Sequence, residues 1–150
     1  MLRLSRKTIL ALEAVVDIAI NARPDPVQSK EITRRQGIPQ RYLEQVMQSL
    51  VHAGILRGVR GPRGGYRLAR ERRRISVGDV VRVVAMLEVA DEEPLAPGSE
   101  LAQRVVRPLV EKTHAGLMTQ LDAITIEDLC NEAEKKGVAA TEAERQDFTI

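Results

Sequence analysis

The sequence predicts a mainly α-helical fold that carries one small β-hairpin. Apolar residues recur every three or four positions along most of the 150 residues, which is the spacing of one face of a helix. Aromatic residues make up only 2% of the chain, so alanine and aliphatic side chains must fill the core. The stretch 55–69 differs, because two short extended runs flank a glycine-rich turn there.

Three helices are predicted before that hairpin. The first spans residues 5–21, and the prolines that follow prevent its continuation. Ser29 is the expected N-cap of a second helix over residues 29–35. A third helix, residues 39–53, opens on a proline and ends before Gly54. Three helices followed by a hairpin is the element order of a winged helix-turn-helix.

The second half of the chain predicts further helices. Ser76 and Asp79 resemble a capping box at the start of a fourth helix. Residues 88–99 are acidic and lack periodicity, so they are expected to form an exposed loop. Thr125 is expected to cap a last short helix that ends near Lys136.

A long helix with one apolar side is predicted between the acidic loop and that last helix. Its stripe includes Leu101, Val105, Leu109, Leu117 and Leu121. Pro108 lies within this helix and is expected to bend it or split it in two. The apolar side favours contact with another apolar surface.

Charge is distributed unevenly along the chain. Residues 1–75 hold 16 basic and 6 acidic side chains, a formal charge of +10. Residues 76–150 hold 7 basic and 15 acidic side chains, a formal charge of −8. A cationic half attracts polyanions, so nucleic acid or an anionic membrane surface is the leading class of partner. The alternative is a basic face that is merely solvated.

The predicted helix 39–53 has two distinct faces. The apolar face consists of Leu43, Val46, Met47 and Leu50. The opposite face consists of Arg41, Glu44, Gln45 and Gln48. Arginine, glutamine and glutamate match the hydrogen-bonding edges of base pairs in the major groove, so this face is a candidate for reading DNA. Two alternatives stay open: the face is only solvated, or Glu44 only orients Arg41 through a local ion pair.

The predicted hairpin is rich in arginine. Its guanidinium groups belong to Arg57, Arg60, Arg63, Arg67 and Arg70. The glycines of its turn let backbone N–H groups approach phosphates, or let an arginine enter the minor groove. The turn lacks the lysine and the hydroxyl residue of a nucleotide-binding loop. Alternatively, the glycines only form a tight turn, and the basic cluster 70–74 is a surface tether.

Beyond these patterns, the sequence resembles the bacterial Rrf2 family of regulators, the group of IscR, NsrR and CymR. The matching motifs are Tyr42-Leu43-Glu44-Gln45, Gly54-Ile55-Leu56, Val59-Arg60-Gly61-Pro62, Gly64-Gly65-Tyr66 and Leu68-Ala69. The resemblance also includes Leu4-Ser5-Arg6-Lys7 and Thr125-Ile126-Glu127-Asp128-Leu129, so it covers nearly the whole chain.

This resemblance implies a homodimer in which the long helix crosses that of its partner. Each protomer would place one winged helix-turn-helix on half of a palindromic operator in double-stranded DNA. The implied organisation is a DNA-binding domain over residues 1–87, an acidic loop over 88–99, dimerisation helices over 100–137 and a flexible tail over 138–150. The implied dimerisation residues are those of the apolar stripe.

The resemblance also implies roles for individual residues. Arg41, Glu44 and Gln45 would meet base edges. Tyr42 and the N-terminal basic residues would meet phosphates, and Arg60 with Gly61 would serve the wing. The full set of expected DNA-binding residues is Arg6, Lys7, Lys30, Gln40, Arg41, Tyr42, Glu44, Gln45, Gln48, Arg57, Arg60, Gly61, Arg63, Gly64 and Tyr66.

No cofactor and no metal site are expected. Family members that sense iron, nitric oxide or redox state hold an iron–sulfur cluster through three cysteines before the long helix, whereas residues 88–105 contain none. The single cysteine, Cys130, is expected to be a buried, inert thiol, with a redox role as the alternative. His52 lies near the end of the third helix, and His114 has no cysteine or second histidine nearby, so the two histidines are not expected to form a metal site. The chain resembles the cluster-free branch typified by CymR, which a protein partner or an unidentified signal controls.

The sequence therefore predicts a sequence-specific, cytoplasmic transcriptional regulator that acts as a repressor and answers to a protein or small-molecule effector. No catalytic arrangement is found, so an enzyme is not expected. No apolar run reaches the roughly 18 residues needed to cross a membrane, and no signal peptide is found. Two alternatives stay open: an interaction adaptor whose basic half binds an acidic protein, and a nucleoid protein without a preferred DNA sequence.

Overall fold

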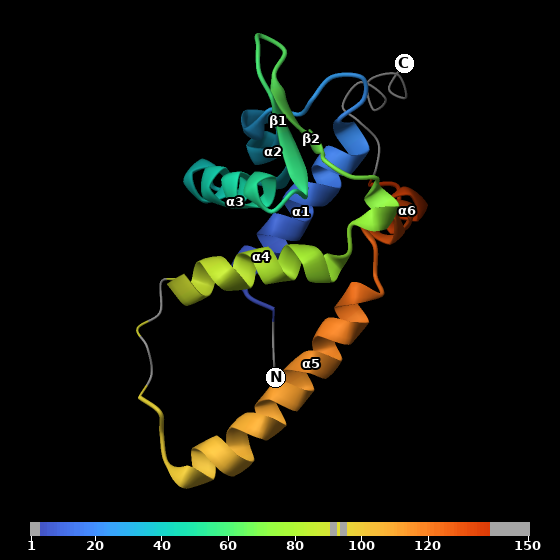
Figure 1. The fold of residues 1–150 in the computed structure, drawn as a ribbon. Coiled ribbons are helices and arrows are strands. Elements are labelled where there is room, and N and C mark those ends of the chain that lie inside the picture. The colour runs from blue at the N-terminus through green and yellow to red at the C-terminus, as the bar shows by residue number, and fades with distance from the viewer. Residues whose placement is uncertain (1–3, 91–92, 94–95, 139–150) are drawn as a thin grey trace.

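The computed structural model describes residues 4–90, 93 and 96–138. Its helices are α1 Arg6–Asn21, α2 Ser29–Gln36, α3 Gln40–His52, α4 Val77–Ala90, α5 Arg107–Asp122 and α6 Ile126–Lys135. Its strands are β1 Leu56–Val59 and β2 Gly65–Leu68, and its short helical segments are η1 Arg72–Arg74 and η2 Ala102–Val106. The predicted mainly α-helical fold with one hairpin is confirmed (Figure 1).

α1 is the central helix of the main core. The helices α2, α3, α4 and α6 and the strand β2 all pack against it. Its buried side contains Ala11 and Ala14, whose small side chains let the neighbouring helices come close. α3 contributes its four predicted apolar residues, all of which are fully buried. Each of these four larger side chains contributes about 1.5–3 kcal/mol through burial, which holds α3 in a fixed orientation.

The start of α2 differs from the prediction. Ser29 is the first helical residue, and Gln28 takes the N-cap position. The backbone N–H of Gln28 donates to Glu31 Oε2 at 3.3 Å, which satisfies a group at the helix start. Glu31 is the third residue after the N-cap Gln28. If Ser29 were the N-cap, the third residue would be Ile32, whose side chain has no hydrogen-bond acceptor. The capping partner therefore decided where the helix begins.

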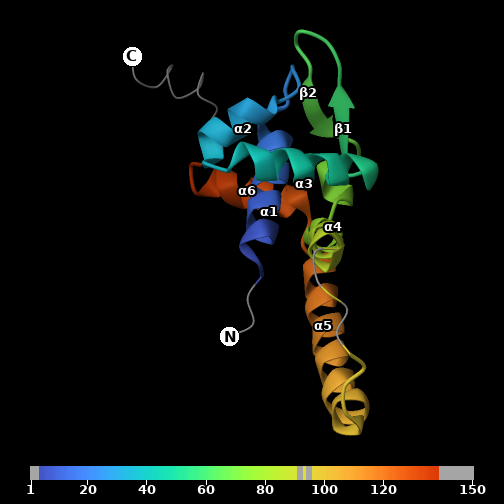
Figure 2. The ribbon, with the colours of Figure 1, turned by 90° about the vertical axis from the view of Figure 1, so that its left-hand side faces the viewer.

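The hairpin is antiparallel and projects from the helical body (Figures 1 and 2). Its register pairs Leu56 with Leu68. Val27 forms a single antiparallel β-bridge with Tyr66 of β2. The N–H and carbonyl of Val27 exchange hydrogen bonds of 3.0 and 2.7 Å with the Tyr66 backbone. A Cβ atom at Gly65 would lie 2.4 Å from the Val27 carbonyl oxygen, so this close approach requires glycine.

The predicted capping box at Ser76 and the predicted cap at Thr125 are both confirmed, and the second is a capping box too. Ser76 Oγ accepts the Asp79 N–H at 3.0 Å, and Asp79 Oδ2 accepts the Ser76 N–H at 3.0 Å. Thr125 and Asp128 exchange the equivalent bonds at 3.1 and 2.9 Å. These four side chains begin α4 and α6 where the sequence predicted.

The predicted loop 88–99 begins later than expected. α4 continues to Ala90, because Val89 and Ala90 extend the helix until the acidic residues follow. Residues 93 and 96–99 have no regular structure, and residues 91–92 and 94–95 lie outside the described residues. The predicted flexible tail, residues 138–150, lies outside them too, apart from Val138.

The α-helical hydrogen bonding of the long helix is interrupted just before Pro108, where the sequence predicts a bend or a split, and α5 begins at Arg107 with the proline in its first turn. The five residues Ala102–Val106 form a π-helix directly before it, and the Arg107 N–H donates to the Ala102 carbonyl. This wider hydrogen-bond spacing accommodates the donor that proline lacks and the space that its ring needs. The helices α1 to α4 and α6 and the hairpin form one unit, which we call the winged body. η2 and α5 together form an arm that extends away from it (Figure 2).

Candidate nucleic-acid interface

The predicted reading face of α3 is exposed. Arg41, Glu44, Gln45 and Gln48 all face solvent, on the side opposite the four buried apolar residues. Glu44 Oε1 accepts a hydrogen bond of 3.2 Å from Gln40 Nε2, one helical turn earlier. Within the described residues, no ion pair joins Glu44 to Arg41. The face therefore presents both donors and acceptors, as the reading of base edges requires.

Tyr42 fastens α3 to the start of α1. Its hydroxyl donates to the Lys7 carbonyl oxygen at 2.6 Å, and the Lys7 ammonium lies 5.9 Å from the centre of its ring. Burial, with a smaller effect from Glu88, raises the pKa of Tyr42 to about 12, so its hydroxyl stays protonated at neutral pH. This hydroxyl, expected at a phosphate, has an acceptor inside the protein. Arg6 and Lys7 are exposed beside it.

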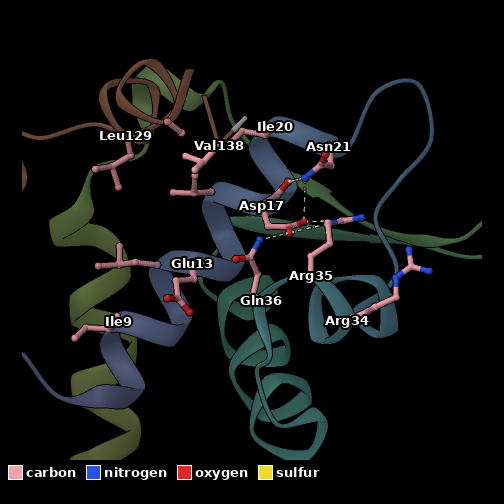
Figure 3. Close-up of a pocket in the computed structure, with 13 residues that line it drawn as sticks. Ile9, Glu13, Asp17, Ile20, Asn21, Arg34, Arg35, Gln36, Leu129 and Val138 are labelled. Carbon is pink, nitrogen blue, oxygen red and sulfur yellow. Dashed lines mark hydrogen bonds and ion pairs between the residues drawn. The ribbon is translucent and has the colours of Figure 1, made fainter. Parts of the chain in front are cut away.

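A buried carboxylate fixes α2 against α1, a contact that the sequence analysis missed (Figure 3). The Asp17 side chain is fully buried and accepts hydrogen bonds from Arg35 Nε at 2.9 Å and Nη2 at 2.7 Å. It also accepts one from Gln36 Nε2 at 2.8 Å. An acidic residue among the buried positions of a helix is the sequence signal that such a partner exists. Lys30 remains exposed on the clamped α2.

The wing arginines divide into two groups. Arg57, Arg60 and Arg63 are exposed along the hairpin. Arg67 is turned inward, where its guanidinium donates to the Ala22 carbonyl at 3.0 Å and to the Pro24 carbonyl. Arg70 is also used internally and donates to the Arg74 carbonyl at 3.2 Å. Three guanidinium groups of the five are therefore available to a nucleic acid on this hairpin.

The turn of the wing requires glycine at two positions. Gly61 has a φ of 114°, which L side chains rarely adopt. A Cβ atom at Gly64 would lie 2.4 Å from the Val59 carbonyl oxygen. Tyr66, which was expected at the interface, packs its partly buried side chain against the main core. The glycines thus shape the wing, and Tyr66 anchors it.

The predicted dimerisation stripe is largely exposed on the arm. Leu101 and Leu109 are 66% and 65% exposed, and Val105 and Leu117 are also exposed. Leu121 differs, because it packs beside Met118 at the place where the C-terminal part of α5 contacts α4, which we call the joint. The stripe is therefore open over most of its length and covered by α4 only at its C-terminal end.

The side chains of this chain do not fit an iron–sulfur cluster. Its one cysteine, Cys130, is 3% exposed in α6, and burial raises the pKa of its thiol, although Arg72 opposes this shift. In the part of the chain that the structure describes, no three His, Cys, Asp or Glu side chains gather to hold a metal ion. None of the described helices combines the length and apolarity needed to span a lipid bilayer.

Comparison with known proteins gives matches along most of the chain. The model of the Rrf2 family, described as "Iron-dependent Transcriptional regulator", matches residues 4–132. The protein rrf2 of Nitratidesulfovibrio vulgaris is 31% identical over 136 residues, which cover 88% of this chain and 89% of that protein. The HTH-type transcriptional regulator IscR of Vibrio cholerae is 42% identical over 83 residues, which cover 55% of this chain. These residues cover 48% of the Vibrio cholerae protein, so the match spans about half the length of that relative.

Solved structures show the same fold. IscR of T. potens is 36% identical with a TM-score of 0.71, and the match covers 93% of this chain and 94% of that one. CymR of B. subtilis is 28% identical with a TM-score of 0.65, and the match covers 88% and 98%. The relatives are transcriptional regulators rather than enzymes. This chain belongs to the Rrf2 family of winged helix-turn-helix transcriptional regulators.

Proposed function

We propose that this chain is a homodimeric repressor that binds a palindromic operator and needs no iron–sulfur cluster to do so. The observation that carries the proposal is the exposed polar face of α3 beside the arginine-bearing wing. The basic first half of the chain, at +10, supplies the attraction to the DNA backbone.

In this proposal α3 enters the major groove. Arg41, Glu44 and Gln45 contact base edges there, because their side chains match guanine, cytosine and adenine, respectively. Arg6 and Lys30, from the starts of α1 and α2, contact phosphates and fix the register of the helix. The exposed wing arginines follow the adjacent backbone or enter the minor groove.

The arm is the surface through which two copies of the chain associate. Its exposed leucines and valines pair with those of another chain, so that two winged bodies face the same side of one duplex. The two α3 helices then lie about 34 Å apart, or a multiple of it, which corresponds to one DNA turn. A dimer that occupies a promoter this way blocks transcription, and an effector releases it by changing that separation.

Selection from a pool of random duplexes, at fixed salt, tests the reading function. The wild-type chain should enrich a palindrome, and Gln45→Ala should relax preference at one symmetric position by about 1–3 kcal/mol. Lys30→Ala is the matched control, since loss of a phosphate contact should weaken preferred and random DNA alike. Equal losses for both variants on both kinds of DNA would remove α3 as the reader.

Transcription from the selected palindrome tests the repressor role. With the palindrome placed over a promoter in vitro, added wild-type chain should lower transcript yield, and Gln45→Ala should lower it less. An increase in transcript on addition of the wild-type chain would identify an activator instead. Enrichment of no sequence at all would favour a nucleoid protein.

A further inference from the structure

The arm packs against the winged body near its C-terminal end, and its N-terminal end is connected to α4 by the acidic loop. Leu101 and Leu109 are exposed far along the arm, whereas Met118, near its C-terminal end, is 8% exposed. Met118 packs with Val77 and Val81 of α4 in a small separate core. At 1.5 Å per residue, the helix over residues 100–122 is about 34 Å long, so a rotation of about 10° at the joint would displace its N-terminal end by about 6 Å. That displacement exceeds the roughly 3.4 Å between neighbouring base pairs.

Two backbone hydrogen bonds join α4 to the turn at the end of the arm. The Val77 N–H donates to the Ile124 carbonyl at 2.8 Å, and the Ile126 N–H donates to the Ile75 carbonyl at 2.8 Å. Both bonds lie between the start of α4 and the turn that connects α5 with α6. They are adjacent along one short bridge, so they hold the start of α4 and the turn after α5 together at a single place.

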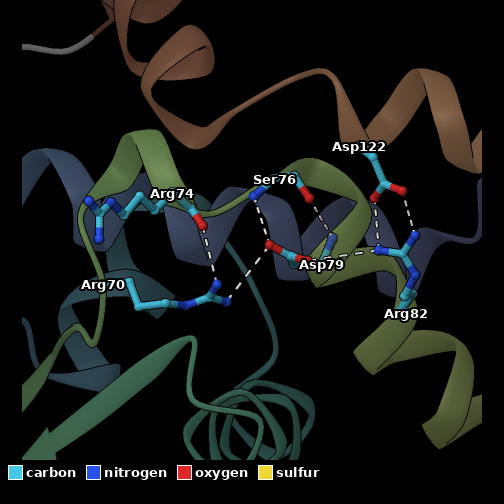
Figure 4. A network of polar contacts seen from close by, with 6 residues as sticks. All are labelled: Arg70, Arg74, Ser76, Asp79, Arg82 and Asp122. Atoms are coloured by element: carbon cyan, nitrogen blue, oxygen red, sulfur yellow. Dashed lines mark hydrogen bonds and ion pairs between the residues drawn. The ribbon is translucent and has the colours of Figure 1, made fainter.

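A charged side-chain pair also spans the joint, in addition to the apolar contact of Met118 with α4 (Figure 4). Arg82 of α4 donates from Nη1 to Asp122 Oδ1 at 2.7 Å and from Nη2 to Asp122 Oδ2 at 2.5 Å. Two parallel bonds between planar groups fix orientation as well as distance. Gly78 permits this approach, because a Cβ atom there would lie 1.9 Å from Asp122 Oδ1.

The same network reaches the base of the wing. Asp79 Oδ1 lies 3.8 Å from Arg82 Nη1, and Asp79 Oδ2 lies 3.7 Å from Arg70 Nη2. Arg70 lies two residues after the end of β2, and Asp79 is itself held by the capping box of α4. The wing, the first turn of α4 and the end of α5 therefore share one set of charged contacts (Figure 4).

We propose that Arg82 and Asp122 set the angle between the winged body and the arm, and thereby determine which separation of two operator half-sites the dimer accepts. Both are positioning residues, since they act through the placement of α3 and the wing. The proposal rests on the proposed function, because half-site separation matters only for a dimer that grips DNA through two winged bodies.

The test compares the half-site separations that wild-type and variant chains select from the random duplex pool. The wild type should enrich one separation. Arg82→Gln and Asp122→Asn should each lower the preference for that separation over those one or two base pairs away by about two- to fivefold. Affinity for a duplex carrying a single half-site, and the dimer mass in sedimentation, should stay at wild-type values.

Arg104→Gln is the matched control. Arg104 forms an ion pair of 2.7 Å with Glu100, one helical turn earlier in the arm. Loss of the Arg104 charge removes this exposed ion pair and leaves the joint unchanged. This variant should select the wild-type separation. A joint variant that forms dimers, binds a single half-site normally and still selects only the wild-type separation would overturn the inference and leave the proposed function standing. A wild type that enriches no paired half-sites would overturn both.

Discussion

Single charged residues in the winged body serve either the fold or the surface, and their surroundings decide which. Arg35 and Arg67 find acceptors inside the protein, at the Asp17 carboxylate and at the carbonyls that follow α1. Arg57 and Arg60 have exposed side chains along the hairpin. A guanidinium that is bound internally costs entropy and charge if it is pulled out to a phosphate, so only the second group suits DNA contact.

Removal of the buried carboxylate should destabilise the fold strongly. Asp17→Ala leaves the Arg35 guanidinium without its bidentate partner in a mostly buried place, at a cost of about 3–5 kcal/mol in the free energy of unfolding. Urea denaturation measures this change. Asp25→Ala, at an exposed position after α1, is the control and should stay within about 0.5 kcal/mol of wild type. Similar effects of the two substitutions would contradict a structural role for Asp17.

Among the elements, the hairpin depends most on close backbone contact. Gly65→Ala should break the Val27–Tyr66 bridge, because the new methyl group would overlap the Val27 carbonyl oxygen. The expected cost is about 1–3 kcal/mol, measured by thermal unfolding, with faster amide hydrogen exchange at Tyr66.

Gly58→Ala is the matched control within the same hairpin. A Cβ atom at Gly58 meets nothing within 4 Å, so this variant should keep the wild-type melting temperature or exceed it slightly. Protection of the Tyr66 amide that survives in Gly65→Ala would contradict the close approach.

The joint between α4 and α5 should depend on pH with a defined sign. The hydrogen bonds from Arg82 hold the pKa of Asp122 below its usual value of 3.8. The carboxylate therefore adds stability that is fully present above that usual value and is lost as pH falls through the lower folded pKa. The stability difference between wild type and Asp122→Asn, measured by urea denaturation, should be constant above about pH 5 and shrink at more acidic pH. A difference that instead shrinks toward alkaline pH would contradict this ion pair.

At the scale of the whole molecule, the hairpin and the N-terminal end of the arm lie at opposite ends of the molecule (Figures 1 and 2). α3 and the exposed wing arginines belong to the winged body, and the open apolar stripe belongs to the arm. The proposed DNA contact and the proposed association with a second copy therefore involve separate surfaces, so each can be altered without direct damage to the other.

Dimerisation should consequently be separable from folding. Leu109→Arg places a charge in the middle of the exposed stripe and should yield monomers in sedimentation at micromolar concentration, with an unchanged helical circular dichroism signal. Glu111→Arg puts the same side chain on the opposite side of α5 and should remain dimeric. A Leu109→Arg variant that sediments as a dimer would show that the two chains meet elsewhere.

The sequence by itself determined those features that depend on neighbours within about four residues. The capping boxes at Ser76 and Thr125 and the two faces of α3 follow from local hydrogen bonds and helical periodicity, so they could be predicted. The order of three helices followed by a hairpin predicted the winged fold, and the family resemblance implied the same fold. The N-cap of α2 was predicted one residue too late, at Ser29 instead of Gln28. Both residues are polar, and the position of Glu31 favours Gln28.

The tertiary structure alone decided which distant groups meet. Asp17 and Arg35 are 18 residues apart, and Arg82 and Asp122 are 40 apart, so no spacing rule pairs them. The inward turn of Arg67 likewise depends on the carbonyls left free after α1. Such contacts form only once the helices have packed, because packing brings groups that are distant in sequence within hydrogen-bonding reach of one another.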